Sequence, residues 1–337
     1  MPSFEEARRK IIQVTQGLDR REARNSVALD AALGRILAER IVSDRDYPPF
    51  HRSARDGFAL RAADLGESGG TLACIGEIRA GQGFEGSVRA GECVQIMTGA
   101  AVPEGADSVV MIEYTRESIE DSRPRIHFER GAEKGQNIVP RGSESHSGQL
   151  LLSSGARLGY PELAIAAQVG KPVLSVFARP RVAILSTGDE VVAVDAPPGP
   201  LQIRNGNGVS IAAQVQLAGG EPFSLGNAPD TEGAIRTKIE RGLAEDALVI
   251  SGGVSKGKYD LVEPVLAGLG AEFHMDEVDI RPGKPAVFGV CQGRPVFGLP
   301  GNPGSTMVTF ELFVLPAIDI LSGTAPRALP VLRAKLA

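Results

Sequence analysis

Apolar residues recur along this chain first with a helical period and later with a strand period, and the changes mark its organisation. Over 3–16 they follow a helical spacing behind Ser3, and Glu6 stands three residues later. A serine followed at this distance by a glutamate is a capping box, so a helix is predicted over 3–16. A second helix is predicted over 26–40, where the apolar residues share one helical face. These residues are Val27, Leu29, Leu33, Ile36 and Leu37.

From about Val42 to about His146 the apolar runs are short and are broken by glycine, proline and acidic residues. The runs are "TLACIGEIRA", "ECVQIMTG", "DSVVMIEY" and "RIHFE". Short apolar runs between turn residues are typical of β-strands, so an all-β module is predicted here. Helical spacing returns in "YPELAIAAQVG".

From Pro180 onward, strand-like runs alternate with helical spacing. The strand runs are "RVAILST", "DALVIS" and "RPVFGLPG". Helices are predicted over 209–219, behind Asp230 as a cap, over "DLVEPVLAGL" and over 305–321. This alternation through short loops predicts a parallel α/β sheet with helices on both faces. Ligands of such sheets bind at the carboxyl ends of the strands.

Four glycine-rich loops fall at those strand ends. They are "STGDE" (186–190), "SGGVSKGKYD" (251–260), "RPGKP" (281–285) and "GLPGNPGS" (298–305). Glycine lets backbone N–H groups approach a ligand closely, and helices that start after such loops add their positive ends. Positive charge is supplied by Lys256, Lys258, Arg281 and Lys284. The loops therefore predict a cradle for a phosphorylated ligand.

Carboxylates stand among these loops at Asp189, Glu190 and Asp260. Beside a phosphate they would be repulsive unless a divalent cation bridged them, and oxygen ligands favour Mg²⁺. The pattern indicates phosphoryl or nucleotidyl chemistry in which a metal offsets charge. The alternative for any single loop is an ordinary turn. Asp189 could equally cap a helix, and the two lysines of 251–260 could be solvated surface charges.

Composition narrows the class of protein. The 337 residues suffice for two or three domains, and the net charge of −5 argues against nucleic acid as a partner. The three cysteines, Cys74, Cys93 and Cys291, show neither a disulfide framework nor metal spacing. The charged start shows no signal peptide, and the apolar run "MVTFELFVLPAIDIL" is too short to span a bilayer. We therefore expect a cytoplasmic protein without a membrane partner.

Several long blocks resemble the molybdopterin molybdenumtransferase family, which includes MoeA and the E domain of gephyrin. The resemblance runs in order from near the N-terminus to about residue 323. Its blocks are "PPFHRSARDGFAL" (48–60), "AGECVQIMTGAAVPEGADSVVMIE" (90–113), "GQNIVPRG" (135–142), "RVAILSTGDEVV" (181–192), "SGGVSKGKYD", "IRPGKPAVFG" (280–289) and "GLPGNPGSTMVTFELFVLP" (298–316).

The resemblance implies a reaction and an architecture. The reaction inserts molybdate into adenylylated molybdopterin with Mg²⁺ as cofactor, and it releases AMP. The active cleft of the implied homodimer is completed by the β-rich module of the partner subunit. The expected fold is a parallel α/β sheet domain with an inserted β-rich domain and an elongated helical linker. The implied parts are a linker over 1–45 with 147–176, the β-rich domain over 46–146, the α/β domain over 177–323, and a remnant of an otherwise absent β domain over 324–337.

The resemblance also assigns roles to residues of this sequence. Asp56, Glu190 and Asp260 match the family's active-site carboxylates, and with Glu144 they are the expected metal ligands. Ser251, Gly252 and Gly253 match the phosphate cradle. The remaining expected binding residues are Asn205, Ser255, Lys256, Lys258, Lys284, Pro300, Gly301 and Asn302.

Some positions depart from the family pattern. Where "DNSAMDG" is usual, this chain has "HRSARDG", which introduces His51, Arg52 and Arg55, and Asn205 replaces a usual aspartate. Added positive charge and lost negative charge weaken the binding of a cation and favour an anion. These departures leave open a non-catalytic paralogue that binds molybdopterin or its cofactor. Without the resemblance, the loops also suit an α/β nucleotidyltransferase acting on another phosphorylated small molecule.

Overall fold

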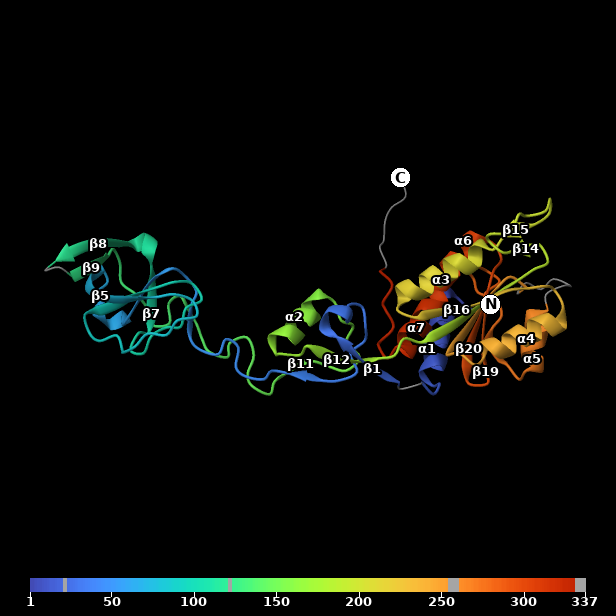
Figure 1. Ribbon diagram of the computed structural model, residues 1–337, viewed down its shortest axis with the longest axis horizontal. Helices are drawn as coiled ribbons and strands as arrows, with labels where there is room; N and C mark the ends of the chain where they lie inside the picture. Colours follow the sequence, from blue (N-terminus) through green and yellow to red (C-terminus); the bar gives the residue numbers. More distant parts are fainter. Residues whose placement is uncertain (21–22, 121–122, 254–260, 331–337) are drawn as a thin grey trace. The chain divides into compact units, whose positions relative to one another are not determined.

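The computed structural model describes residues 1–20, 23–120, 123–253 and 261–330. They form two compact units, one made of Met1–Arg40 and Leu152–Ala337 and the other of Ile41–Leu151. Each unit has its own sheet and core, and the α/β pattern predicted from Pro180 onward lies in the first of them (Figure 1).

The described part of the first unit contains a six-stranded sheet in the order β16-β13-β17-β20-β19-β18. Its strands are β13 (Arg181–Thr187), β16 (Glu221–Ala228), β17 (Ala247–Ser251), β18 (Glu272–Met275), β19 (Val287–Cys291) and β20 (Arg294–Leu299). The pairings among β16, β13, β17 and β20 are parallel, whereas β19 is antiparallel to both of its neighbours. The predicted parallel sheet is therefore confirmed for four strands, and the last two make the sheet mixed.

Helices cover both faces of this sheet. One face carries α1 (Phe4–Gln16), α3 (Gly206–Ala218), α6 (Pro303–Thr309) and α7 (Leu315–Leu321), and the other carries α4 (Glu232–Gly242) and α5 (Val262–Gly268) (Figure 1). The alternation along β13 explains this arrangement. Val182 and Ile184 pack into the first core, and Ala183 and Leu185 pack into the second. Side chains of period two thus fill two cores from one strand.

The helix signals of the sequence fix some boundaries better than others. Ser3 caps α1, with both hydrogen bonds of the capping box to Glu6, as predicted. The helical spacing of "YPELAIAAQVG" is confirmed as α2 (Tyr160–Gln168). Helix α3 starts three residues before the predicted 209 because Asn205 caps it. The cap predicted at Asp230 was wrong, since Thr231 holds the N-cap position of α4.

The helix predicted over 26–40 was also wrong. The segment forms β1 (Arg24–Ala28) and a short 3₁₀ turn over Leu29–Ala31, and β1 pairs with β12 (Val173–Phe177). Gly34 then adopts φ +75°, which no helix contains. Pairing with a distant strand overrides the helical spacing of the apolar residues, and Leu33 on the predicted apolar face is largely exposed.

Helices α6 and α7 are joined by a π-helical stretch over Phe310–Val314 into one helix over 303–321. Its apolar run was expected to be too short to span a bilayer, but within the described residues this is the one helix that is long and apolar enough to cross a membrane, and half of its most apolar window is buried. Its apolar side chains, such as Phe310, Phe313 and Ile318, belong to the core under the sheet. Packing therefore accounts for its apolarity.

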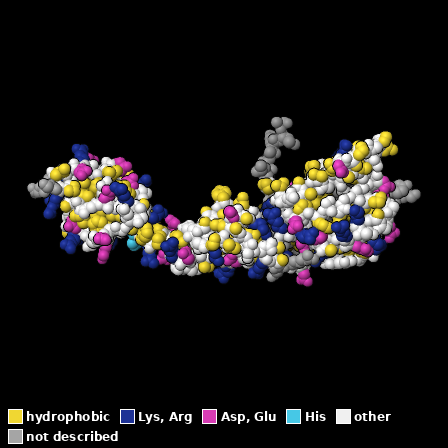
Figure 2. All heavy atoms as spheres, viewed as in Figure 1, with side chains coloured by type: hydrophobic (Ala, Val, Ile, Leu, Met, Phe, Trp, Pro, Cys, Tyr) yellow, Lys and Arg dark blue, Asp and Glu magenta, His cyan; other side chains and the backbone are white. Residues whose placement is uncertain are grey.

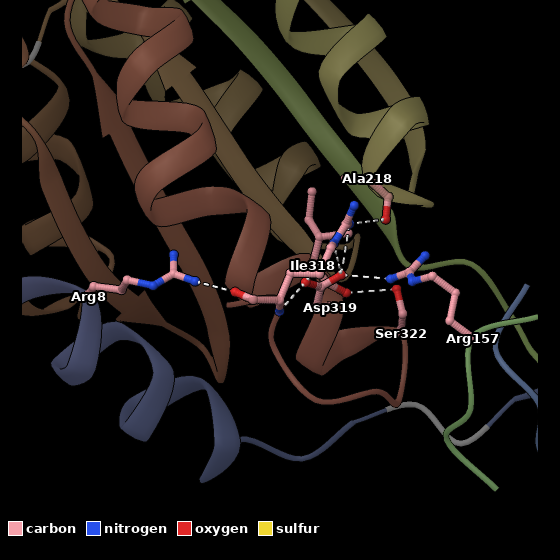
Figure 3. A network of polar contacts seen from close by, with 7 residues as sticks. Arg8, Arg157, Ala218, Ile318, Asp319 and Ser322 are labelled. Carbon is pink, nitrogen blue, oxygen red and sulfur yellow. Dashed lines mark hydrogen bonds and ion pairs between the residues drawn. The ribbon is translucent and has the colours of Figure 1, made fainter. Parts of the chain in front are cut away.

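Asp319 of α7 anchors a polar network inside this unit (Figure 3). Its side chain is fully buried, and Arg157 Nη2 donates to Oδ1 at 2.8 Å. Arg327 donates from Nη2 to Oδ1 at 2.9 Å and from Nε to Oδ2 at 3.0 Å. Arg8 adds a hydrogen bond to the carbonyl of Arg327 at 2.7 Å. The buried carboxylate thus holds Arg157 and Arg327, and Arg327 in turn is held by Arg8 of α1.

The second unit is built around a six-stranded sheet of described strands, in the order β7-β4-β6-β5-β9-β8. The strands are β4 (Gly57–Leu60), β5 (Gly70–Ile78), β6 (Glu92–Ile96), β7 (Ser108–Met111), β8 (Thr115–Glu120) and β9 (Arg123–Phe128). Shorter strands are β2 (Ile41–Val42), β3 (Arg52–Ser53), β10 (Ile138–Val139) and β11 (Leu150–Leu152). Every β-like run of the sequence coincides with one of these strands, so the predicted β-rich module is confirmed.

Candidate functional site

A pocket of about 130 Å³ opens where the parallel strands β13 and β17 end. Its wall comes from loops that follow the strands and from the start of α3. The lining residues are Ser186, Thr187, Glu190, Val191, Ile203, Arg204, Asn205, Gly206, Asn207, Ser251, Gly252, Gly301 and Pro303. The pocket therefore lies at the carboxyl edge of the sheet, where ligands of α/β folds bind.

The floor of the pocket needs glycine. Gly252 and Gly253 have φ of +89° and +65°, which L side chains rarely adopt. A Cβ at Gly252 would lie 2.9 Å from the carbonyl oxygen of Thr187, and one at Gly253 would lie 2.7 Å from Thr187 Oγ1. The hydroxyl of Thr187 is buried and has no hydrogen-bond partner among the described residues. A bound polar group would satisfy it.

Two asparagines hold the wall together. Asn205 Oδ1 accepts hydrogen bonds from Gly208 N and from Ser186 Oγ, both at 2.9 Å. Asn207 Nδ2 donates to Ser251 Oγ at 2.8 Å and to the carbonyl of Gly301 at 2.9 Å. The side chain of Asn207 thus joins the loop after β17 to the loop after β20. Because it spans both loops, it sets the width of the pocket.

The charges of the pocket are mixed. Glu190 and Arg204 are its charged lining residues, and the N-terminus of α3 enters it at Gly206. A helix N-terminus carries a partial positive charge and unpaired N–H groups, which stabilise an anion. The Glu190 carboxylate lies over Gly188, where an added Cβ would meet Oε2 at 2.5 Å. The pocket thus places the start of α3, which can stabilise an anion, beside the Glu190 carboxylate.

Five of the residues predicted from the sequence line this pocket together: Glu190, Asn205, Ser251, Gly252 and Gly301. Gly253 lies directly behind it, against Thr187. Lys284, Pro300 and Asn302 do not line it. Ser255, Lys256, Lys258 and Asp260 lie outside the described residues.

The loop over 281–285 also lies at the carboxyl edge of the sheet, but it packs against α6 and does not line the pocket. It precedes β19, whose first residue Val287 pairs with Gly298 near the end of β20. A Cβ at Gly283 would lie 2.6 Å from Thr309 Cγ2, so this loop packs against α6. Lys284 is exposed, and its carbonyl accepts hydrogen bonds from Val278 N and Ala286 N. Asn302 likewise acts as the N-cap of α6, accepting from Gly304 N at 3.1 Å.

Asp56 and Glu144 belong to the second unit. Asp56 Oδ1 accepts from the backbone N and from Oγ1 of Thr98, both at 2.7 Å, and these bonds lower the pKa of Asp56. Glu144 Oε1 instead accepts from Arg52 Nη2 at 2.9 Å. In the part of the chain that the structure describes, no three His, Cys, Asp or Glu residues form a group that could hold a metal.

Replacing the Thr98 hydroxyl should raise the pKa of Asp56. In Thr98→Val the hydroxyl donor is lost while the larger cause, the backbone N–H, remains, so the pKa of Asp56 should rise but stay below its ordinary value. A depressed pKa favours the ionised folded state at pH above the unfolded pKa, and this gain is lost as pH falls through the folded pKa. Titration of the carboxyl carbon by NMR measures the shift. An unchanged pKa contradicts the assignment, and Thr71→Val, whose hydroxyl bonds His127, is the control.

Four polar lining residues were given no individual role from the sequence: Ser186 and Thr187, which lie in the predicted loop over 186–190, and Arg204 and Asn207, which lie outside the four loops. Ser186 and Thr187 close the buried run of β13, and two hydroxyl side chains at the end of an apolar strand were the available signal. Asn207 follows the cap of α3 by two residues. Its role depends on two loops that are distant in sequence, so spacing alone gave no signal.

Known proteins are similar to this chain over nearly its whole length. Residues 2–170 match the family described as MoeA N-terminal region (domain I and II), and residues 183–319 match a probable molybdopterin binding domain. A molybdopterin molybdenumtransferase of Nostoc sp. is 38% identical over 98% of this chain and 77% of its own length. One of Bacillus subtilis is 37% identical over 87% and 69%. The crystal structure of the MoeA protein from Pyrococcus horikoshii OT3 superposes with a TM-score of 0.79 at 28% identity, covering 96% of this chain and 80% of that one.

Proposed function

This chain belongs to the molybdopterin molybdenumtransferase family, and we propose that it inserts molybdate into adenylylated molybdopterin, releasing AMP. It is an enzyme of molybdenum cofactor biosynthesis, as its curated relatives are. The observation that carries the proposal is the pocket at the carboxyl edge of the sheet, in which Gly252, Gly301 and the N-terminus of α3 surround space for an anionic group.

The small size of the pocket suits the phosphate end of the substrate and not the whole molecule. About 130 Å³ is well below the several hundred Å³ of a site that encloses a drug-sized ligand. It suits a phosphate group, whose oxygens would accept from the hydroxyls of Thr187 and Ser251 and from the start of α3. The pterin and the adenylate would extend beyond it. The loop over 251–260 would then wrap the phosphate, with Ser255, Lys256 and Lys258 adding donors and positive charge.

Mg²⁺ is the proposed cofactor. Its preferred ligands are carboxylate and other oxygen atoms, and Glu190 supplies one such group in the pocket. We assign Asp260 and Asp56 as further ligands. One oxygen of Glu144 is already paired with Arg52, so Glu144 is the least suited of the four. When bound, Mg²⁺ would offset the charge of the phosphate oxygens and of the departing AMP.

We further propose a homodimer with the domain division implied by the family. The linker would span 1–45 with 147–176, except that α1 packs on the α/β sheet, the β-rich domain would span 46–146 and the α/β domain 177–323. The β-rich domain of one subunit would bring its Asp56 to the pocket of the other, which would complete the set of carboxylates. A cytoplasmic location accompanies this proposal.

Glu190→Gln should lower Mg²⁺-dependent AMP release by roughly a hundredfold or more, because a metal ligand matters at least as much as the residues that orient it. The assay incubates pure protein with adenylylated molybdopterin, molybdate and Mg²⁺ and measures AMP and active cofactor. Glu240→Gln, which changes an exposed carboxylate of α4, is the matched control. Asp260→Asn should abolish the release.

Two outcomes would contradict the proposal. Wild-type protein that binds the pterin but releases no AMP would instead be the non-catalytic paralogue that the changes at Arg52, Arg55 and Asn205 leave open. Release that persists in Glu190→Gln would remove this carboxylate from the reaction.

A further inference from the structure

A second and larger pocket, of about 410 Å³, lies at the opposite edge of the same sheet. Arg181 and Arg294, the first residues of β13 and β20, and Asp246, just before β17, line it. Because these strands are parallel, the pocket lies at their amino ends, away from the pocket described above. It belongs wholly to the first unit.

Arginine dominates the charge of this pocket. Its five arginines are Arg20, Arg35, Arg179, Arg181 and Arg294, and its three acids are Asp19, Glu221 and Asp246. Five positive and three negative charges leave an excess of two, although the protein as a whole carries −5. Asn25 of β1 (Arg24–Ala28) also lines the pocket, and Figure 2 shows Lys and Arg side chains in dark blue, interspersed with magenta Asp and Glu, on the face that it draws.

The carboxylates lie close to one of the arginines, Arg181, and not to all five. Arg181 Nε lies 3.3 Å from Glu245 Oε2 and 3.9 Å from Glu221 Oε1, and its backbone N donates to Asp246 Oδ2 at 2.8 Å. The negative charge therefore surrounds Arg181. Arg35, Arg179 and Arg294 have no carboxylate within salt-bridge distance among the described residues.

Arg35 and Arg179 also act on each other. Arg35 is half-buried and donates from Nη2 to the carbonyl of Phe177 at 3.0 Å. Burial first, and then the positive charge of Arg179, lower the pKa of Arg35. Two like charges held together without a counter-charge are unfavourable unless an anion binds between them.

We propose that this arginine pocket binds a dianionic, phosphate-type oxyanion, either free or as the phosphate group of a small metabolite. Arg35, Arg179 and Arg294 would hold it, since guanidinium groups match the geometry of tetrahedral oxyanions. The open volume accommodates the remainder of a small phosphate ester. This site is separate from the proposed pterin pocket, and its existence does not depend on the proposed reaction.

Isothermal titration of the full chain with inorganic phosphate, molybdate and AMP tests the proposal. We expect binding at low ionic strength that weakens as salt is added. The double variant Arg179→Ala/Arg294→Ala should raise the Kd by about tenfold or more for each lost arginine. Binding of phosphate and molybdate identifies a site for free oxyanions, and tighter binding of AMP identifies a site for phosphate esters.

Two control variants test whether the effect comes from loss of charge alone and whether the anion binds at the other pocket. Arg9→Ala removes one positive charge from an exposed position of α1, as each substitution of the double variant does at the arginine pocket, and Arg204→Ala alters the pocket at the carboxyl edge. Both should bind the anion at the arginine pocket as the wild type does, and thermal unfolding without ligand checks the fold of every variant. The proposal is overturned if no anion binds, if the double variant binds as the wild type, or if Arg204→Ala alone abolishes binding. AMP release without added anion should be unchanged in the double variant.

Discussion

Asp319→Ala should destabilise the first unit by about 3–5 kcal/mol, the usual effect of removing one partner of a buried ion pair. The carboxylate is fully buried and binds both Arg157 and Arg327. Without it, the two guanidinium groups would face each other, and the pKa of Arg157 is already lowered by burial and then by Arg327. The bonds that the Asp319 carboxylate makes to Arg157 and Arg327 in Figure 3 would be lost together.

Urea unfolding followed by helical circular dichroism measures this effect, because most of the described α-helical residues belong to the first unit. Asp319→Asn keeps the shape and should have a smaller effect. Asp195→Asn changes an exposed carboxylate and should stay within about 0.5 kcal/mol of the wild type. A loss below about 1 kcal/mol in Asp319→Ala would show that the network contributes little net stability.

The fold of the first unit was largely predictable because its periodicities are strong. The buried run of β13 and the cap of α1 depend on neighbouring residues, which a sequence displays directly. The helix prediction over 26–40 was wrong for the opposite reason. The structure of this segment depends on pairing between β1 and β12, which are separated by more than a hundred residues, and helical spacing cannot reveal such a partner.

In the candidate site, too, some features were predictable from the sequence and others were not. Glycine loops at strand ends were predictable from backbone geometry, and Gly252 and Gly301 do line one pocket. Charge was a weaker guide. Lys284 stands in a glycine loop like the others but does not line the described pocket, and its loop packs against Thr309 through Gly283. Arg204 and Asn207, which the sequence did not single out, take places in the wall.

The two edges of the sheet have different chemistry for a structural reason. At the carboxyl edge, glycines and a helix N-terminus present backbone N–H groups, and the side-chain charge is nearly balanced between Glu190 and Arg204. At the amino edge, whole guanidinium groups supply the charge. Backbone groups position a specific phosphate closely, whereas long arginines hold an anion with less fixed geometry. We therefore expect binding at the amino edge to be the more sensitive to salt.

Gly252→Ala should impair both the fold and the pterin pocket. An alanine at φ +89° is strained, and its Cβ would lie 2.9 Å from the carbonyl oxygen of Thr187. Strain of this kind costs about 1–3 kcal/mol. We expect a lower thermal unfolding temperature together with weaker binding of adenylylated molybdopterin, measured by pterin fluorescence. Gly233→Ala, in open space on α4, should be neutral or stabilising by up to about 1 kcal/mol.

Gly301→Ala separates binding from folding. Gly301 has no positive φ, and its Cβ would meet only the Cα of Gly252 at 3.9 Å, an ordinary contact. Stability should therefore stay within about 0.5 kcal/mol of the wild type. The added methyl group would nevertheless stand in a pocket of about 130 Å³ that a phosphate is proposed to fill. Binding of adenylylated molybdopterin should weaken about tenfold or more, the scale of one charged hydrogen bond. Wild-type affinity in this variant would mean that the substrate does not enter the pocket between Gly252 and Gly301.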